Sequence, residues 1–264
     1  MADQEALRHS RHALLDGIDD EGVAALQAAR VLIIGAGGLG CPAALYLSAS
    51  GIGQLHWFDG DQVDATNLAR QTLFGPDDIG QLKVVAGARA LRRTSPNTEV
   101  IAEPRFVDTS LLDAAIPLAD VVLDCTDQWS IRQLINARCV AHQKPLVSAA
   151  AIEWSGQLLS VDPRQSEQAC YACLFDPQTE PAAHACGAYG VLSPLVGVMG
   201  CLQAAEAIKL IVRGRHPGSS LPSAGQSLTL VELKTGRWQQ VSVARNPQCP
   251  VCASQRTNIA QPKS

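Results

Sequence analysis

The sequence predicts an α/β fold in which helices cover both faces of a mostly parallel sheet, with antiparallel strands added toward the C-terminus. Three observations predict it. The aliphatic run Val31–Ile34 leads into a glycine-rich turn and then into an Ala/Leu-rich segment of helical character. Strand-like runs and helix-like segments then alternate as far as residue 151. Beyond residue 151 the alternation stops, and short strands with a hairpin signal follow.

The glycine-rich turn, residues 35–40, is the first feature with a chemical meaning. Gly35 permits the tight turn, Gly37 lets the backbone approach a phosphate, and Gly40 lets the helix pack closely. The helix N-terminus then offers unpaired N–H groups and a positive dipole end to an anion. This pattern predicts a Rossmann-like nucleotide-binding unit.

An acidic residue supports this interpretation. Asp59 ends the second aliphatic run, 19 positions after Gly40, where a ribose hydroxyl is usually bound. NAD and ATP both fit the motif. The alternative is a tight turn that binds no ligand.

The other elements follow from the same patterns. Residues 5–28 predict one or two short helices before the first strand. After the glycine turn we expect a strand at 54–59, an irregular polar segment at 64–80, a helix at 80–94, a strand around 100–101, a helix at 109–116, a strand at 121–124, a helix at 129–142 and a strand at 145–151. Further on we expect a strand at 156–161, a long non-periodic segment at 163–193, a helix at 194–213 and a hairpin at 228–243.

Composition excludes several function classes. The 264 residues are 47% hydrophobic and 17% charged, with a net charge of −4, so no basic surface for nucleic acid is expected. The N-terminus is polar and acidic, unlike a secretory signal. No uninterrupted apolar run reaches the length needed to span a membrane. We therefore expect a soluble cytoplasmic protein.

Two cysteine pairs predict a metal site. Cys170 and Cys173 form one Cys-x-x-Cys pair, and Cys249 and Cys252 form another that begins 76 residues after Cys173. Together they can supply the four thiolates of a closed, structural zinc site that clips the C-terminal segment to the body of the protein. A redox pair or free thiols are the alternatives.

The remaining cysteines divide into two groups. Cys41, Cys125, Cys139 and Cys201 lie in apolar contexts and are interpreted as small core residues. Cys186 lies instead in the non-periodic segment, next to His184, and is a candidate nucleophile.

Several charged residues favour ATP over NAD. Chemistry at an acyl group with ATP needs cations near the phosphates and a carboxylate for Mg²⁺. Arg70 lies beyond the second strand, Lys83 opens the next helix, and Arg8 and Arg11 precede the first strand. Asp127, after the strand at 121–124, is placed to help bind Mg²⁺. Hydride transfer needs none of these cations.

The combination resembles the ThiF/MoeB/HesA adenylyltransferases, the bacterial relatives of ubiquitin-activating enzymes. The resemblance runs from about Arg8 to Cys252. It rests on Arg-x-x-Arg at residues 8–11, the glycine turn, Asp59-Gly60-Asp61, Asn67-Leu68-x-Arg70-Gln71, Lys83, Asp124-Cys125-Thr126-Asp127 and the two cysteine pairs.

The resemblance implies a reaction and a substrate. A ubiquitin-fold sulfur-carrier protein, MoaD-like or ThiS-like, presents its C-terminal Gly-Gly carboxylate to the α-phosphorus of ATP. An acyl-adenylate and pyrophosphate result, for molybdopterin or thiamine biosynthesis. The residues implied to bind the nucleotide and Mg²⁺ are Gly35, Gly37, Gly38, Gly40, Asp59, Asp61, Asn67, Arg70, Gln71, Lys83, Asp127 and Gln128.

The resemblance also implies partners and one departure. Members of this family are homodimers in which Arg11 would reach the ATP of the other subunit. Cys186 matches a loop position that can link to the carrier through sulfur. Sulfur would come from a separate donor such as a cysteine desulfurase or rhodanese. Gln128 stands where the family usually has Asn, which moves the amide outward by one methylene.

We therefore expect a single domain over residues 1–264: a helical arm at 1–28, a nucleotide-binding half at 29–151, a carrier-binding half with the zinc site at 152–252, and a tail at 253–264. Two other functions fit parts of the sequence. One is an NAD-binding oxidoreductase, and the other is a non-catalytic zinc scaffold that binds a ubiquitin-like partner.

Overall fold

The computed structural model describes residues 2–179, 190–222 and 227–253. The helices of four or more residues are α1 Ala2–Ala13, α2 Asp19–Gln27, α3 Gly40–Ala49, α4 Lys83–Thr94, α5 Thr109–Ala115, α6 Trp129–Ala141, α7 Tyr171–Leu174 and α8 Ser193–Arg215. The strands are β1 Arg30–Ile34, β2 Gln54–Phe58, β3 Glu99–Glu103, β4 Val121–Asp124, β5 Leu146–Ile152, β6 Ser155–Val161, β7 Ser227–Glu232 and β8 Arg237–Ser242.

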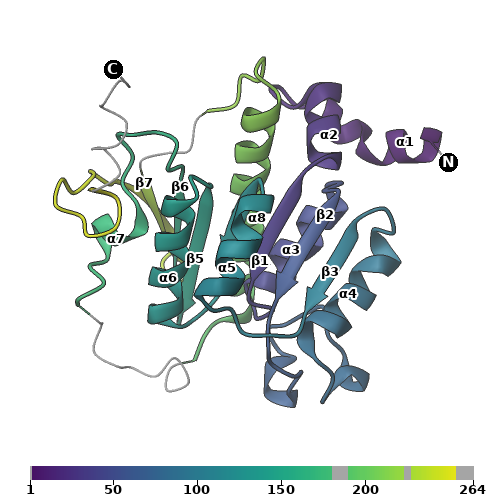
Figure 1. Ribbon diagram of the computed structural model, residues 1–264. Coiled ribbons are helices and arrows are strands. Elements are labelled where there is room, and N and C mark those ends of the chain that lie inside the picture. Colours follow the sequence, from purple (N-terminus) through teal and green to yellow (C-terminus); the bar gives the residue numbers. More distant parts are fainter. Residues whose placement is uncertain (1, 180–189, 223–226, 254–264) are drawn as a thin grey trace.

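All strands form one sheet, in the order β3-β2-β1-β4-β5-β6-β7-β8. The first five strands are parallel, and β6, β7 and β8 add in antiparallel pairs (Figure 1). This confirms the expected fold class. The strand order reverses direction between β1 and β4, where Ile34 lies opposite Asp124. Ligands of open α/β sheets bind at such a reversal, beyond the carboxyl ends of the strands.

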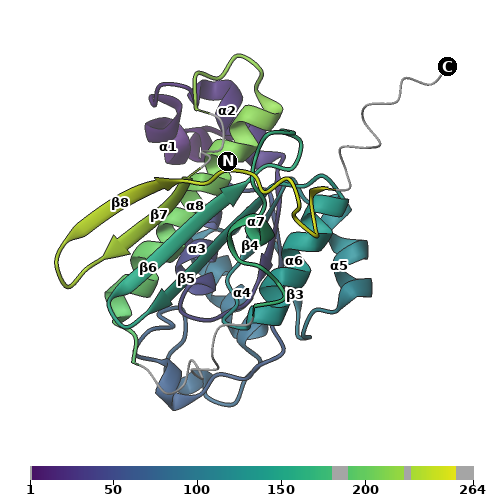
Figure 2. The same ribbon diagram turned by 90° about the vertical axis from the view of Figure 1, so that its left-hand side faces the viewer.

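Helices cover the parallel part of the sheet in two layers. Helices α3, α4 and α8 lie on one face, and α5 and α6 lie on the other, while the β7–β8 hairpin extends beyond them (Figure 2). Each layer buries its own core. The first core includes Ile33, Leu47 and Trp57, and the second includes Leu32 and Ile135, so alternate residues of β1 face opposite layers.

Helix α8 is long and apolar enough to cross a membrane by length and composition. The sequence interpretation did not identify such a segment, because single polar residues interrupt the apolar run. In the folded chain α8 packs on α3 and on strands β4, β5 and β6, with Leu195, Met199 and Ile211 buried. It therefore forms the core of one helical layer.

Two segments expected to lack regular structure contain short helices. The polar segment at 64–80 holds the 3-10 helices η1 Ala65–Asn67 and η2 Pro76–Asp78. A further 3-10 helix, η3 Ile116–Leu118, follows α5. The segment at 163–193 holds α7. A helix of four residues is too short to show a periodic pattern, so sequence periodicity could not reveal it.

Candidate active site

The carboxyl edge of the sheet carries the candidate site. It comprises residues 35–40 after β1, Asp59–Asp61 after β2, Asn67–Gln71, Lys83, and residues 124–128 after β4. Parallel strands bring these segments to one edge because their carboxyl ends all point the same way.

The glycine turn has the geometry that its sequence predicts. Gly35 has φ = +101°, and a Cβ there would lie 2.7 Å from the carbonyl oxygen of Cys125. A Cβ on Gly40 would lie 2.0 Å from the carbonyl oxygen of Gly35. Neither position admits a side chain. Around Gly37, by contrast, the nearest atom to a Cβ would be Gln71 Nε2 at 3.9 Å, so the backbone there is open to a ligand.

Helix α3 begins at this turn with its N–H groups available. No side chain caps its N-terminus at Leu39, although the N–H of Cys41 donates to the carbonyl of Gly37 at 3.0 Å. The helix dipole adds partial positive charge at the same place. An uncapped N-terminus beside an open glycine backbone suits a phosphate group.

Asp59 directly follows the neighbouring strand β2, and its side chain contacts the backbone of the glycine turn. Its carboxylate accepts the N–H of Ala36 at 2.6 Å and the N–H of Asp61 at 2.8 Å. Burial raises the pKa of Asp59 above its ordinary value, although these two N–H groups and the Lys83 charge oppose the rise. A half-buried carboxylate held in this way can bind a ribose hydroxyl.

A buried lysine lies next to Asp59. The ammonium of Lys83 contacts Oδ2 of Asp61 at 2.8 Å, and its side chain is only 7% exposed, whereas Asp61 is 54% exposed. The backbone reinforces this pair, since the N–H of Lys83 donates to the carbonyl of Asp61 at 2.9 Å. The edge therefore holds a fixed positive charge.

The segment after β2 supplies three more polar side chains. The amide of Asn67 donates to Thr66 Oγ1 at 3.2 Å, and Nη1 of Arg70 donates to the carbonyl of Thr66 at 3.1 Å. Gln71 is buried, and its Oε1 has no hydrogen-bond partner among the described residues. Gln71 is thus a buried polar group beside the open glycine backbone.

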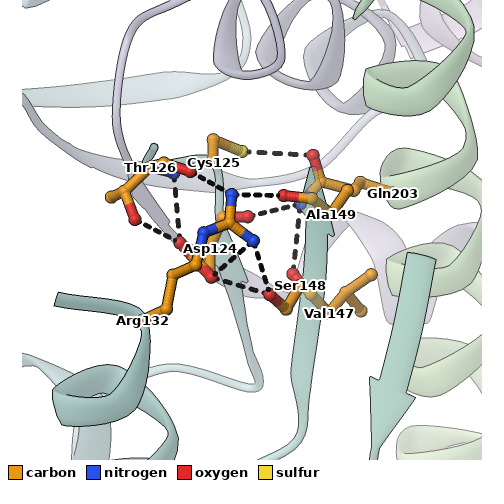
Figure 3. Close-up of polar contacts among 8 residues, drawn as sticks. All are labelled: Asp124, Cys125, Thr126, Arg132, Val147, Ser148, Ala149 and Gln203. Atoms are coloured by element: carbon orange, nitrogen blue, oxygen red, sulfur yellow. Dashed lines mark hydrogen bonds and ion pairs between the residues drawn. The ribbon is translucent and has the colours of Figure 1, made fainter. Parts of the chain in front are cut away.

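The loop after β4 is fixed by a buried polar network (Figure 3). Asp124 accepts Thr126 N–H at 3.0 Å, Thr126 Oγ1 at 2.7 Å and Ser148 Oγ at 2.7 Å. Asp127 and Gln128 follow this network and are exposed at the carboxyl edge. Gln128 is the N-cap residue of α6 but makes no side-chain cap.

Sequence reasoning missed two members of this network. Arg132 on α6 donates to the carbonyls of Thr126 and Ala149, and Nε2 of Gln203 on α8 donates to the carbonyls of Asp124 and Val147. A signal for Arg132 was present. Residues 132, 135, 136, 139 and 140 follow helical spacing and form the buried face of α6. An arginine in that stripe requires a buried acceptor.

Arg132 stays charged in this setting. Burial disfavours its charged form, but the negative charge of Asp124 and a hydrogen bond with Tyr171 outweigh burial and raise the pKa of Arg132.

The two N-terminal arginines lie at the opposite, amino edge of the sheet. Arg8 donates to Ser95 Oγ at 3.1 Å, between α4 and β3, and the His9 ring packs on Gly51, just before β2. Arg11 is exposed on the same helix. Strands of five residues, about 17 Å long, separate the two edges. Arg11 is therefore not brought to the glycine turn of its own chain.

The four predicted metal ligands do meet. Their sulfurs all lie within 4.8 Å of one another, with separations of 3.9 Å for Cys170–Cys173, 3.6 Å for Cys170–Cys249 and 3.5 Å for Cys173–Cys252. Tetrahedral zinc with Zn–S bonds of about 2.3 Å would place its sulfurs about 3.8 Å apart. The cluster therefore fits zinc and closes a loop across the second core.

Helix α6 supports this cysteine cluster too. Asn136 donates to Cys170 Sγ at 3.7 Å and accepts the N–H of Tyr171 at 3.0 Å. A hydrogen bond to a ligand sulfur is typical of the second layer of contacts around a metal.

The other cysteines agree with their interpretation as core residues. Cys41, Cys125 and Cys139 are buried and Cys201 is half-buried. Burial raises the pKa of Cys41 to about 12 and raises the pKa of the other three as well. These thiols are therefore inert at neutral pH. Cys186, the candidate nucleophile, lies outside the described residues.

The fold and the carboxyl edge define a doubly wound, nucleotide-binding type of α/β protein with an added four-cysteine cluster. The chain belongs to the ThiF family, whose model matches residues 9–251. This confirms the family resemblance drawn from the motifs.

Individual relatives support this family assignment. The chain is 42% identical to the sulfur carrier protein ThiS adenylyltransferase of Escherichia coli K12, over 96% of this chain and 97% of the relative. It is 41% identical to the molybdopterin-synthase adenylyltransferase of the same strain, over 96% and 98%. Among solved structures, it is similar to E. coli MccB determined with ATP, with a TM-score of 0.77 and 26% identity over 93% of this chain and 74% of that one.

Proposed function

We propose that this protein is an adenylyltransferase that activates the C-terminal Gly-Gly carboxylate of a ubiquitin-fold sulfur carrier with ATP and releases pyrophosphate. The observation that carries the proposal is Lys83, a buried cation held by Asp61 beside an open glycine turn. Two relatives with more than 40% identity over nearly the whole chain are adenylyltransferases, and their names point to sulfur-carrier chemistry.

Each side chain at the carboxyl edge then has a task. Asp59 holds the ribose, and the open backbone at Gly37 and the α3 N-terminus receive phosphates. The carrier carboxylate attacks the α-phosphorus, and negative charge develops on the departing pyrophosphate. Lys83 and Arg70 stabilise that charge because they are fixed in place before it forms.

Asn67 and Gln71 complete the contacts with the nucleotide. Both are amides at the same edge. The buried Oε1 of Gln71 has no hydrogen-bond donor among the described residues and can accept one from the nucleotide. Asp127, an exposed carboxylate after β4, offers the oxygen ligand that Mg²⁺ prefers. Bound Mg²⁺ would neutralise phosphate charge. The cysteine cluster, with four thiolates and no open position, would hold zinc in a structural role.

A homodimer would complete the site. Arg11 lies at the amino edge of its own chain, so it can serve a nucleotide only in another copy. It is flanked on one helical face by Leu7 and by Leu14 just beyond α1, which are 72% and 76% exposed. Exposed leucines at i and i+7, with an arginine at i+4 on the same helical face, are typical of a contact surface. We propose that this face docks on a second copy and delivers Arg11 to its ATP.

The first experiment is carrier-dependent ATP–pyrophosphate exchange, run in parallel with a ThiS-like and a MoaD-like carrier. Exchange with one carrier would establish the chemistry and the pathway together, and exchange with both would identify a shared activator. Exchange with neither, from zinc-loaded dimeric protein, would refute the proposal. Nicotinamide-dependent absorbance changes would then favour the NAD-binding alternative, and carrier binding without turnover would favour the scaffold.

A further inference from the structure

Arg132 is a buried arginine to which the proposed function assigns no task. It lies in the first turn of α6 and is about 6% exposed. Nη2 donates to the carbonyl of Ala149 at 2.7 Å and to the carbonyl of Thr126. Nη1 donates to Ser148 Oγ at 3.4 Å and lies 3.7 Å from Oδ2 of Asp124. One guanidinium thus joins β4, β5 and the loop after β4 (Figure 3).

The Thr126 carbonyl is the important acceptor. It belongs to the peptide group that joins Thr126 to Asp127, so the guanidinium fixes the backbone immediately before that carboxylate. The same loop touches the glycine turn, since a Cβ on Gly35 would meet the Cys125 carbonyl at 2.7 Å. A shift of this loop would therefore move Asp127 relative to the phosphate-binding backbone.

The loop is held from both faces of the sheet. Arg132 reaches it from the α6 face. Gln203 reaches it from α8, donating to the Asp124 carbonyl at 2.8 Å and to the Val147 carbonyl at 3.1 Å, while its Oε1 accepts Cys125 Sγ at 3.4 Å. The main-chain carbonyls that these two side chains bond lie at or just after the carboxyl end of β4, or on the part of β5 that pairs beside it.

Stability is a weak explanation for this network. A buried ion pair of Arg with Asp loses hydration, and well-packed apolar residues in its place are often as stable or more stable. What an apolar pair cannot do is fix loop carbonyls with directed donors. The planar guanidinium can donate to two carbonyls at once, whereas a lysine ammonium has no comparable fork.

We propose that Arg132 is a positioning residue that sets the Thr126–Asp127 peptide, and with it the Asp127 carboxylate, for the magnesium nucleotide. The inference rests on the proposed function for the role of Asp127. A displacement of about 1 Å at a reacting centre can lower the rate by about 10²-fold. Arg132 is thus expected to affect turnover more than nucleotide affinity.

The test compares Arg132→Gln and Arg132→Lys with Arg138→Gln. Arg138 is a matched control because it lies on the same helix and pairs with an aspartate, donating from Nε to Asp113 at 2.6 Å, far from the carboxyl edge. Pyrophosphate exchange is measured for kcat, for the KM of ATP and for the Mg²⁺ concentration that gives half-maximal rate. Thermal unfolding and zinc content are measured in parallel.

We expect Arg132→Gln to lower kcat by about 10²-fold and to raise the half-maximal Mg²⁺ concentration about tenfold, with a rise in the KM of ATP of at most about tenfold. Arg132→Lys should recover part of the loss, because charge remains beside Asp124 but the second carbonyl contact does not. Arg138→Gln should match the wild type in all three quantities. Gln203→Met, which removes the contacts from the other face, should reproduce the pattern if Arg132→Gln is too unstable to purify.

Two results would overturn the inference. One is a folded Arg132→Gln protein with kcat and Mg²⁺ dependence within twofold of the wild type. The other is an equal loss in Arg138→Gln.

A binding experiment separates this inference from the proposed function. Calorimetric titration with ATP, with and without Mg²⁺, needs no carrier. If Mg²⁺ strengthens ATP binding in the wild type and in Arg138→Gln but not in Arg132→Gln, the positioning role holds even if no carrier supports exchange. If Mg²⁺ strengthens binding equally in all three, the positioning role is wrong.

Discussion

The carboxyl edge and the cysteine cluster are built in opposite ways, although α6 contributes to both. At the edge, exposed polar groups are oriented by buried ones: Arg132 holds the loop before Asp127. In the cluster, the four sulfurs face one another and most are buried. One turn further along α6, Asn136 donates to Cys170. The edge is open, and in our proposal a second copy completes it, whereas the four sulfurs of the cluster close on one another within one chain.

This comparison teaches that stability and chemistry are separated within one layered domain. Three features of the edge lower the free energy of unfolding: open glycine backbone, a half-buried carboxylate and a buried lysine. Zinc bound by the cysteine cluster would add stability across the second core without an open coordination position. The comparison makes four predictions, given from the largest expected effect to the smallest.

Lys83→Ala should impair the chemistry at the carboxyl edge and leave the cysteine cluster unchanged. Loss of one preorganised cation should lower pyrophosphate exchange by about 10²-fold or more, because the charge on the leaving group is no longer stabilised. Circular dichroism and zinc content should not change. Lys144→Ala is the control, since Lys144 donates to the Ala119 carbonyl away from this edge at 2.8 Å. Near-normal exchange in Lys83→Ala would rule out its role.

Mixing two inactive variants should test whether the edge is incomplete in one chain. Arg11→Ala and Asp127→Ala should each be inactive, and exchanged dimers should regain about one quarter of wild-type exchange, because half of the dimers form with one intact site each. Subunit exchange is verified with differently tagged chains. Mixed dimers without activity would argue against an arginine that acts on the other subunit.

Cys249→Ser should remove metal binding by the cysteine cluster and affect the carboxyl edge much less. The purified wild type should contain about one zinc per chain, and the variant should lose it. We expect destabilisation of about 3 kcal/mol or more, which is about 6 °C or more in melting temperature. Pyrophosphate exchange below that temperature should fall less than in Lys83→Ala. Cys201→Ser is the half-buried control. A folded wild type without metal would refute the zinc assignment.

Asp59→Asn should show how much the buried charge of Asp59 destabilises the folded protein. Burial raises the pKa of Asp59, so the folded state binds its proton more tightly than the unfolded state does. The stability of the wild type therefore falls as pH rises from the ordinary Asp pKa through the raised value. Asn does not titrate. Ala36 and Asp61 donate to different oxygens of Asp59, so the single amide oxygen of Asn can accept only one of the two N–H groups.

The lost hydrogen bond lowers the stability of the variant at both pH values, but only the wild type loses stability as Asp59 ionises. The melting temperature of the variant relative to the wild type should thus be higher at pH 7 than at pH 4, by at most about 3 °C. Urea unfolding at both pH values checks the trend, with the exposed Asp77→Asn as control. A relative stability of Asp59→Asn that is lower at pH 7 than at pH 4 would contradict the expectation. ATP binding should weaken, because the ribose contact loses its charge.

The sequence could predict most of the fold because its signals are short-range. Within the described part of the chain, aliphatic runs, the glycine turn and helical spacing predicted each strand and each helix of seven or more residues, with ends that differ by a few residues. The residues after β1, β2 and β4 could be assigned to one edge because parallel strands share a direction. The two cysteine pairs could be joined because four-thiolate sites recur with that spacing.

By itself, then, the sequence determined the parallel character of the first part of the sheet, the four cysteines of the cluster and the polar groups of the carboxyl edge. These depend on residues within one turn or one strand end. Tertiary structure alone decided that Arg132 and Gln203 hold the same loop from opposite faces, and that Arg11 lies at the far edge of its own chain. In these contacts the donor and the acceptor lie 6 residues apart in the sequence for Arg132 and Thr126, and 79 residues apart for Gln203 and Asp124. A local pattern indicates that a buried polar side chain needs a partner, but only the packing of layers determines which one it meets.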